Sequence, residues 1–311
     1  MAAVAIEKSG SSGPDEFSLR GTARVPTHLD ETPWLEFEQA TVLALCDSLE
    51  KELNKLIEKA SAKQVHDTRV ALRRWFSVWS VLKQDDWQSK KFKRQAIARL
   101  RRLLRTLGSL RDWDVNLALA EELGCSKEIV KNWDRERDIA RDNVKTTIKS
   151  LNPGSLMRRV REYLKHRPLK LRDKWAQTGE PMESAFNHID TYILAQEDMV
   201  KELEARAHTP EQLHELRLGV KRWRYMLTEF FGLTTLQLVR AQQILGRLHD
   251  LDRISDLLDG NCPDDVGLRL EEQRRQLLQD FSLIRQCLPY GLRPLWLSTA
   301  AAPGPSPSGP D

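Results

Sequence analysis

Apolar residues recur at helical spacing along almost the whole chain between residues 32 and 290. No segment shows the alternation of apolar and polar residues that marks a half-buried strand. Proline, glycine, asparagine and hydroxyl residues interrupt the pattern at intervals, so it predicts a series of separate helices. The predicted helices span residues 34–59, 62–83, 89–123, 127–150, 153–174, 182–207, 210–231, 235–259 and 264–288.

Local signals support several of these boundaries. Thr209 is followed by a glutamine three residues later, which is the pattern of a capping box at the start of a helix. Ser126 is a good N-cap, and the preceding Gly124 is a plausible helix stop. Gly108 lies inside the helix predicted over 89–123, where we expect it to bend or break that helix.

Residues 62–83 carry two different faces when they are placed on a helix. His66, Arg69 and Arg73 fall within one narrow sector, and the opposite sector is apolar and includes two tryptophans. The tryptophans therefore read as core residues rather than as platforms for stacking bases. One face of this helix packs, and the other presents a histidine and a ladder of cations.

Residues 210–231 repeat this pattern. His214, Arg217 and Lys221 occupy the positions of the first histidine and its two cations, each 148 residues further along. A single histidine of this kind is most simply a satisfied, partly buried side chain. Its recurrence beside aligned cations favours a binding role instead. Cations at spacings of three and four residues on one helix face suit a linear anion such as a chain of phosphates.

Further residues flank these two stripes. Arg74 and Arg222 lie at the edges, about 80° from the centre of each stripe. Arg224 and Tyr225 extend the stripe in the second stretch, whereas Phe76 and a serine hold the matching places in the first.

A second pair of similar segments follows the histidine helices. Residues 107–114 read LGSLRDWD and residues 245–252 read LGRLHDLD, at an offset of 138. Two motifs that recur in the same order predict an internal duplication, with two pseudo-symmetric four-helix bundles. We expect a mobile arm over 1–31, one helical domain over 32–290, and a C-terminal tail over 291–311 that is disordered from about 301. Within the domain we expect a first repeat over 32–150, a basic linking helix over 152–175 and a second repeat over 181–290.

The second motif adds cations and carboxylates. Arg101 and Arg105 share one helix face with the start of the first motif, and Arg111 corresponds to His249 in the second. The four aspartates of the two motifs resemble metal ligands, but we expect them to hold the arginines of the facing helix in position. Arg111 and His249 could face either a ligand or those aspartates.

Charge is unevenly distributed along the chain. The net charge is +4, but residues 145–174 contain ten Lys or Arg and two acidic residues, which leaves the remainder at −4. A concentrated positive field attracts polyanions, although a solvated basic helix explains this segment equally well.

Other classes of protein find little support. The four cysteines show no CxxC spacing, so neither a disulfide framework nor a zinc site is expected. No apolar run is long enough to cross a bilayer, and the N-terminus is a poor signal peptide, so we expect a cytoplasmic protein. Phosphate-binding loops and hydrolase motifs are absent from the sequence. We therefore expect no enzymatic activity, no metal and no cofactor.

The motifs His66-x-x-Arg69-x-x-x-Arg73 and His214-x-x-Arg217-x-x-x-Lys221, each followed by an LGxL(R/H)DxD segment, resemble the CHAD domain, the conserved-histidine α-helical domain. The resemblance spans about residues 33–290. It implies two pseudo-symmetric four-helix bundles around a basic central cavity, and binding of inorganic polyphosphate with possible association with polyphosphate granules and their proteins. Phe76 departs from the family pattern, where a basic residue is expected, so the second repeat is expected to contribute more to binding.

The residues predicted to bind polyphosphate, from the stripes and the resemblance together, are His66, Arg69, Arg73, Arg74, Arg101, Arg105, Arg111, His214, Arg217, Lys221, Arg222, Arg224, Tyr225 and His249. Two alternatives remain open. The segment 145–174 could bind nucleic acid, although exposed aromatic residues near its cations are scarce. The aspartates of the second motif could instead serve a metal-dependent phosphohydrolase.

Overall fold

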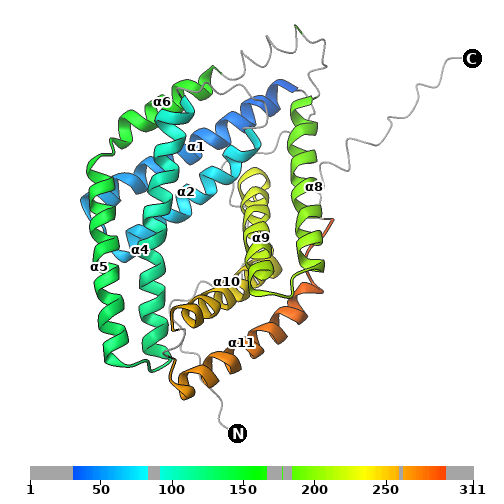
Figure 1. Ribbon diagram of the computed structural model, residues 1–311. Coiled ribbons are helices and arrows are strands. Elements are labelled where there is room, and N and C mark those ends of the chain that lie inside the picture. The colour runs from blue at the N-terminus through cyan, green and yellow to red at the C-terminus, as the bar shows by residue number, and fades with distance from the viewer. Residues whose placement is uncertain (1–30, 83–91, 167–176, 178–183, 259–261, 292–311) are drawn as a thin grey trace, which may run out of the picture.

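The computed structural model describes residues 31–82, 92–166, 177, 184–258 and 262–291. These residues form helices joined by short turns, and no strand occurs among them, which confirms the all-α prediction (Figure 1). The predicted N-terminal arm, apart from Glu31, and the tail beyond Gly291 lie outside the described residues.

The observed helices agree with the predicted ones to within a few residues at most ends. Helix α6 is the exception, because the predicted basic helix continues to residue 174 and its second part lies outside the described residues. The elements are α1 (Glu31–Glu58), α2 (Ala62–Leu82), η2 (Lys93–Ile97, a π-helix), α4 (Ala98–Glu122), α5 (Lys127–Lys149), α6 (Pro153–Lys165), α8 (Ser184–Ala205), α9 (Pro210–Phe231), α10 (Leu236–Leu257) and α11 (Asp264–Arg285).

Most of the predicted boundary signals are confirmed. Thr209 and Gln212 form the reciprocal capping box at the start of α9. The Ser126 side chain accepts the backbone N–H of Ile129 at the start of α5. Gly124 has a φ of 70°, a left-handed conformation that a side chain disfavours, and it separates α4 from α5.

The predicted break at Gly108 is wrong. Helix α4 runs through this residue without interruption, and the irregular turn lies ahead of it in the π-helix η2. A single glycine costs an otherwise well-packed helix only about 1 kcal/mol, so neighbouring leucines that pack into the core override it. Leu103, Leu107 and Leu110 are all buried.

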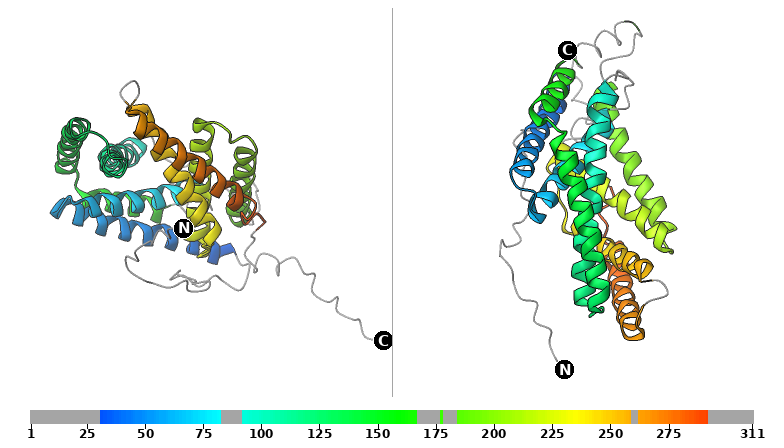
Figure 2. Two further views of the ribbon diagram at one scale, coloured as in Figure 1. Left: turned by 90° about the horizontal axis from the view of Figure 1, so that it is seen from below. Right: turned by 60° about the vertical axis from the view of Figure 1, so that its left-hand side comes forward.

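Consecutive helices pack against each other as pairs, and helices of the first half of the chain also pack against helices of the second half. Helix α2 packs against α1, α4 and α9, while α10 packs against α9, α11 and α4 (Figures 1 and 2). The histidine helix of the first half of the chain therefore contacts the histidine helix of the second half. The helices that carry the LGxL segments, α4 and α10, meet in the same way.

Two apolar clusters hold this arrangement. The larger contains Trp75, Trp79 and Trp223, each at most 1% exposed, and the first two stack with ring centroids 4.8 Å apart. The packing role predicted for these tryptophans is confirmed. The smaller cluster joins α4, α5, α10 and α11 around Trp133 and Leu251. Among the described residues, no helix combines the length and apolar character that a membrane span requires.

Candidate functional site: a partly buried cationic cluster

The cationic faces of α2 and α9 are turned toward a common region. Arg73 of α2 lies close enough to Arg217 and Lys221 of α9 to lower the pKa of both. Arg69 also contributes to the lowered pKa of Lys221. The structure therefore brings the central residues of the two predicted stripes into one cluster, which we call the cationic cluster.

Arg69 is fixed by the LGxL segment of α4. Its side chain is almost fully buried, and Nη1 donates to the backbone oxygens of Gly108 at 3.1 Å and Leu107 at 3.4 Å. The same nitrogen lies 3.7 Å from a carboxylate oxygen of Asp112. Burial, followed by repulsion from Arg73, lowers the pKa of Arg69 to about 10, so the guanidinium stays charged at neutral pH.

Arg217 occupies the corresponding place beside α10. A Cβ atom at Gly246 would lie 3.9 Å from its Nε, so the absence of a side chain lets the arginine lie against the helix. Burial lowers the pKa of Arg217, while the nearby Asp250 opposes that change. Nε is buried and has no hydrogen-bond partner within the described part of the chain. A buried donor without an acceptor lowers the stability of the protein, because it has lost its hydrogen bonds to water and gained none in return.

Lys221 is the most strongly perturbed cation of the cluster. Burial, together with repulsion from Arg217, Arg73 and Arg69, lowers its pKa to about 6. The amine is therefore largely neutral at pH 7 without a ligand. Asp250 acts in the other direction and raises the pKa of Lys221, while burial raises the pKa of Asp250 itself.

Two histidines touch across the α9–α10 contact. Nδ1 of His214 lies 3.0 Å from Nδ1 of His249, and the rings are tilted by 42°. Burial lowers the pKa of both, that of His249 to about 4. In the first half, His66 has Arg111 as its charged neighbour, and burial and this arginine lower the pKa of His66. Arg111 and His249, which were predicted to face either a ligand or the motif aspartates, thus each lie beside the histidine of their own repeat.

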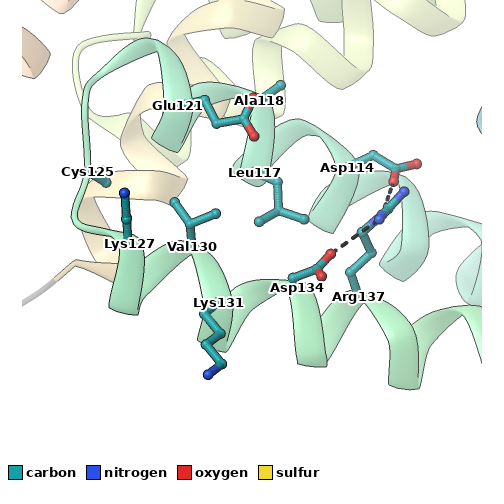
Figure 3. Close-up of a pocket in the computed structure, with 10 residues that line it drawn as sticks. All are labelled: Asp114, Leu117, Ala118, Glu121, Cys125, Lys127, Val130, Lys131, Asp134 and Arg137. Carbon is teal, nitrogen blue, oxygen red and sulfur yellow. Dashed lines mark hydrogen bonds and ion pairs between the residues drawn. The ribbon is translucent and has the colours of Figure 1, made fainter.

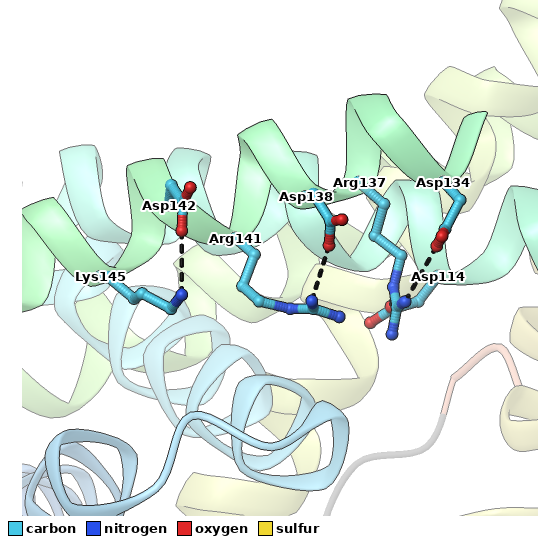
Figure 4. Close-up of polar contacts among 7 residues, drawn as sticks. All are labelled: Asp114, Asp134, Arg137, Asp138, Arg141, Asp142 and Lys145. Atoms are coloured by element: carbon cyan, nitrogen blue, oxygen red, sulfur yellow. Dashed lines mark hydrogen bonds and ion pairs between the residues drawn. The ribbon is translucent and has the colours of Figure 1, made fainter. Parts of the chain in front are cut away.

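Several basic side chains in and beside the cluster lack a partner within the described part of the chain. The side chains of Arg73, Arg111 and Lys221 make no hydrogen bond or ion pair there. On α5, by contrast, Arg137, Arg141 and Lys145 each pair with an aspartate three residues earlier (Figure 4). The outer helix balances its charges locally, whereas the cationic cluster leaves an excess of positive charge.

The residues at the edges of the stripes have protein partners. Arg74 pairs with Glu229, and Arg222 donates to Gln196 at 3.4 Å. Arg224 Nε donates to Gln242 at 2.8 Å, and its guanidinium lies 4.7 Å from the ring centroid of the buried Tyr225. These four residues lie around the cluster and are already engaged.

Helix α4 supplies a cation where the first repeat lacks one. Phe76 holds the position that Arg224 holds in the second repeat, and Arg101 of α4 lies 5.9 Å from the centroid of the Phe76 ring. Arg105 is exposed one turn further along α4. The departure from the family pattern at Phe76 therefore leaves a positive charge nearby.

Three of the four aspartates of the LGxL(R/H)DxD segments pair with arginines, and of these only Asp112 meets an arginine of a histidine helix, Arg69, as predicted. Asp114 accepts from Arg137 of α5 and Asp252 accepts from Arg274 of α11, both at 2.7 Å. Asp112 also pairs with Arg253 at 2.9 Å, which links α4 to α10. The part of the chain described here contains no group of three residues suited to hold a metal ion.

The role of Arg253 was not predicted from the sequence. It follows Asp250 by three residues on α10, and its only visible signal was that one-turn spacing from a motif aspartate. The contact partner, Asp112, lies in the other half of the chain, so only the packing of α4 against α10 reveals it.

A surface pocket of about 830 Å³ lies apart from the cationic cluster, between α4 and α5 (Figure 3). Leu117 and Val130 contribute apolar surface to it, and acidic and basic side chains share its lining. None of the predicted binding residues lines this pocket.

Comparisons with known proteins agree with the motifs. A family model for the CHAD domain matches residues 40–259, which is most of the chain, so the chain belongs to the CHAD family. The crystal structure of the CHAD domain from the plant Ricinus communis is similar, with a TM-score of 0.58 and 20% identity over 83% of this chain and 92% of that one.

PptA from Streptomyces chartreusis is similar with a TM-score of 0.56 and 12% identity, covering 81% of this chain and 96% of that one. At these identities the two structures support the fold alone. No curated protein matched the chain.

Proposed function

We propose that this CHAD protein binds inorganic polyphosphate through the cationic cluster between α2 and α9, without catalysing a reaction. The observation that carries the proposal is the convergence of basic side chains from both histidine helices that have no partner among the described residues, with Arg73, Arg217 and Lys221 at the centre. Membership of the CHAD family supports polyphosphate as the ligand.

A chain of phosphates would supply what the cluster lacks. Each phosphate offers several acceptor oxygens, so one strand can meet guanidinium, ammonium and imidazole donors in succession. The buried Nε of Arg217 would gain an acceptor. Arg69, held by the carbonyls of α4 and by Asp112, would present its remaining donors in a fixed orientation.

Proton uptake is part of this mechanism. An approaching polyanion raises the pKa of nearby bases, because it stabilises their charged forms. Lys221, His214 and His249 are the groups whose pKa values are lowered without ligand, so they gain protons as the anion binds. The contact between the two Nδ1 atoms can hold only one proton, so full protonation of the pair separates the rings.

An internal duplication suits this function, because two similar repeats can each contribute basic side chains to one binding site. We propose that two four-helix repeats enclose a shared basic space, with α2 and α4 contributing from the first and α9 and α10 from the second. The matching contacts Asp114–Arg137 and Asp252–Arg274 support the duplication. Arg101 beside Phe76 compensates the first repeat, so both repeats would contribute to binding. Cytoplasmic polyphosphate granules and their associated proteins are the setting that this activity implies.

The structure favours polyphosphate over a hydrolase site. Three of the four motif carboxylates that a metal-dependent hydrolase would use are engaged, since Asp112, Asp114 and Asp252 each pair with arginine. Nucleic acid is a weaker candidate, because Trp75 and Trp223 lie in the core, and Tyr225, which lies beside Arg224, is also buried rather than free to stack on bases.

The direct test is a calorimetric titration of the full chain with long-chain polyphosphate. The double variant Arg73→Gln/Lys221→Gln is expected to weaken binding at least about 100-fold, because each charge-assisted contact contributes roughly 1.5–3 kcal/mol. The matched control, Arg141→Gln/Lys145→Gln on α5, removes the same formal charge from exposed, locally paired residues and should bind nearly as the wild type does. Equal weakening in both variants would refute the assigned site.

A further inference from the structure

Two of the four cysteines occupy equivalent positions in the two halves of the chain. Cys125 precedes the first residue of α5 by two positions, and Cys262 precedes the first residue of α11 by two positions. The sequence alone gives no reason to pair them, because they are 137 residues apart and share no spacing motif.

The fold brings the two turns that carry these cysteines together. A Cβ atom at Gly124 would lie 3.5 Å from the Arg269 guanidinium of α11. Arg269 pairs with Asp265 in the first turn of that helix, next to Cys262. The turn between α4 and α5 therefore lies against the start of α11 (Figures 1 and 2).

Both thiols also contact the same apolar cluster. Cys125 and Cys262 pack at the edge of the smaller core, which Leu123, Leu258 and Val266 help to form. Each is partly exposed and neither forms a disulfide. Burial raises the pKa of the Cys125 thiol, and the proximity of Cys262 is the second cause of that change.

We propose that Cys125 and Cys262 form a redox-responsive pair that closes a reversible disulfide between the two halves of the protein. The oxidant is a hydroperoxide. The Cys262 thiolate attacks one peroxide oxygen and the O–O bond breaks, which gives a sulfenic acid and water or an alcohol. The Cys125 sulfur then attacks the sulfenic sulfur, the S–S bond forms, and the hydroxyl group leaves as water with the Cys125 proton. The two sulfurs lose two electrons, and the peroxide gains them.

The position of the pair suggests what the disulfide would do. It would tie the end of α4 to the segment that follows α10, and these helices carry Gly108, whose carbonyl oxygen accepts from Arg69, and Gly246, beside which Arg217 lies. A cross-link over so long a loop also restricts the unfolded chain. The proposal is independent of polyphosphate binding, since it concerns the far end of both helices.

The test treats the full chain with hydrogen peroxide at pH 7.5, blocks free thiols and analyses a non-reduced tryptic digest by mass spectrometry. Peptides 112–127 and 254–269 contain one cysteine each. We expect them to appear linked, with a mass two hydrogens below their sum, and to separate on treatment with dithiothreitol. The linked form should also unfold at a higher temperature than the reduced form.

Variants separate this pairing from general oxidation. Cys125→Ser and Cys262→Ser, with Cys125→Ala and Cys262→Ala as second choices if the serine variants fold poorly, should each abolish the linked species. Cys287→Ser changes an exposed cysteine elsewhere and should leave its yield unchanged. The proposal is overturned if the wild type yields only over-oxidised thiols, links between separate molecules, or links to Cys287 at an equal rate.

Discussion

Nδ1 of His214 lies 3.0 Å from Nδ1 of His249, at the contact between α9 and α10. Only one proton fits between two such nitrogens, so this contact belongs to a protein whose histidines are not both charged. The lowered pKa of each ring and of Lys221 agrees with that state. The ligand-free cluster thus holds basic groups in neutral form beside permanently charged arginines, ready to take up protons when an anion arrives.

Polyphosphate affinity is expected to rise as the pH falls from 8.5 to 6. Lys221, with a pKa of about 6 in the free protein, is neutral in most of this range and becomes charged in the complex. Uptake of one proton increases the association constant by up to about tenfold per pH unit. Calorimetry in buffers of different ionisation enthalpy measures the proton count directly. Lys221→Arg, which keeps its charge throughout, should flatten this pH dependence, and an unchanged slope would show that Lys221 is not the group that titrates.

Stability of the ligand-free protein should change with pH in the opposite direction. The pKa of Lys221 is lower in the folded than in the unfolded protein, so the unfolded chain binds more protons between pH 10.5 and 6. The free energy of unfolding therefore decreases as the pH falls from 9 to 6.5. Thermal melts across this range test the sign, and Lys221→Met should remove much of the slope. A stability that increases on acidification contradicts the assignment.

Asp112→Asn should separate binding from catalysis. Asp112 holds Arg69 and Arg253, and its loss leaves more positive charge near the cluster, so polyphosphate affinity should stay equal or increase. Asp112 and Arg253 are partly exposed, and the buried Arg69 keeps its two backbone acceptors in α4, so we expect a loss of stability of under about 1 kcal/mol. Neither protein should release phosphate with magnesium or manganese. Metal-dependent release by the wild type that disappears in the variant would favour the hydrolase.

Trp75→Ala should destabilise the fold by about 3–5 kcal/mol, because a large, fully buried ring is replaced by a cavity. Urea unfolding measures this change. Leu268→Ala is the matched control, since Leu268 is 68% exposed and its truncation should alter stability by no more than about 0.5 kcal/mol. Equal effects of the two substitutions would mean that the tryptophan stack does not organise the core.

Much of the fold could be predicted because its signals are local. The capping box at Thr209, the glycine turn at Gly124 and the 3.6-residue apolar periodicity each fix an element within its own segment. Gly108 shows the limit of such signals. The low helix propensity of glycine can be recognised from the sequence alone. The burial of the neighbouring leucines, which keeps α4 continuous, depends on tertiary packing.

Part of the candidate site could also be predicted from local sequence signals. Periodicity places His66, Arg69 and Arg73 on one face, but it does not reveal which partner each side chain meets. The engagement of Arg74 by Glu229, the placement of Arg101 beside Phe76 and the Asp112–Arg253 pair all join segments far apart in sequence. These relationships depend on how helices pack, which a single sequence does not encode in any short spacing.

The measurement that tests the central claim most directly is a titration with short and long polyphosphate at two salt concentrations. Because α2 and α9 contribute cations to one cluster, long chains should bind far more tightly than short ones. With about four phosphates neutralised, affinity should fall roughly 50- to 100-fold between 0.1 and 0.3 M salt. Affinity that is independent of chain length and nearly insensitive to salt would contradict a shared polyanion site between the two histidine helices.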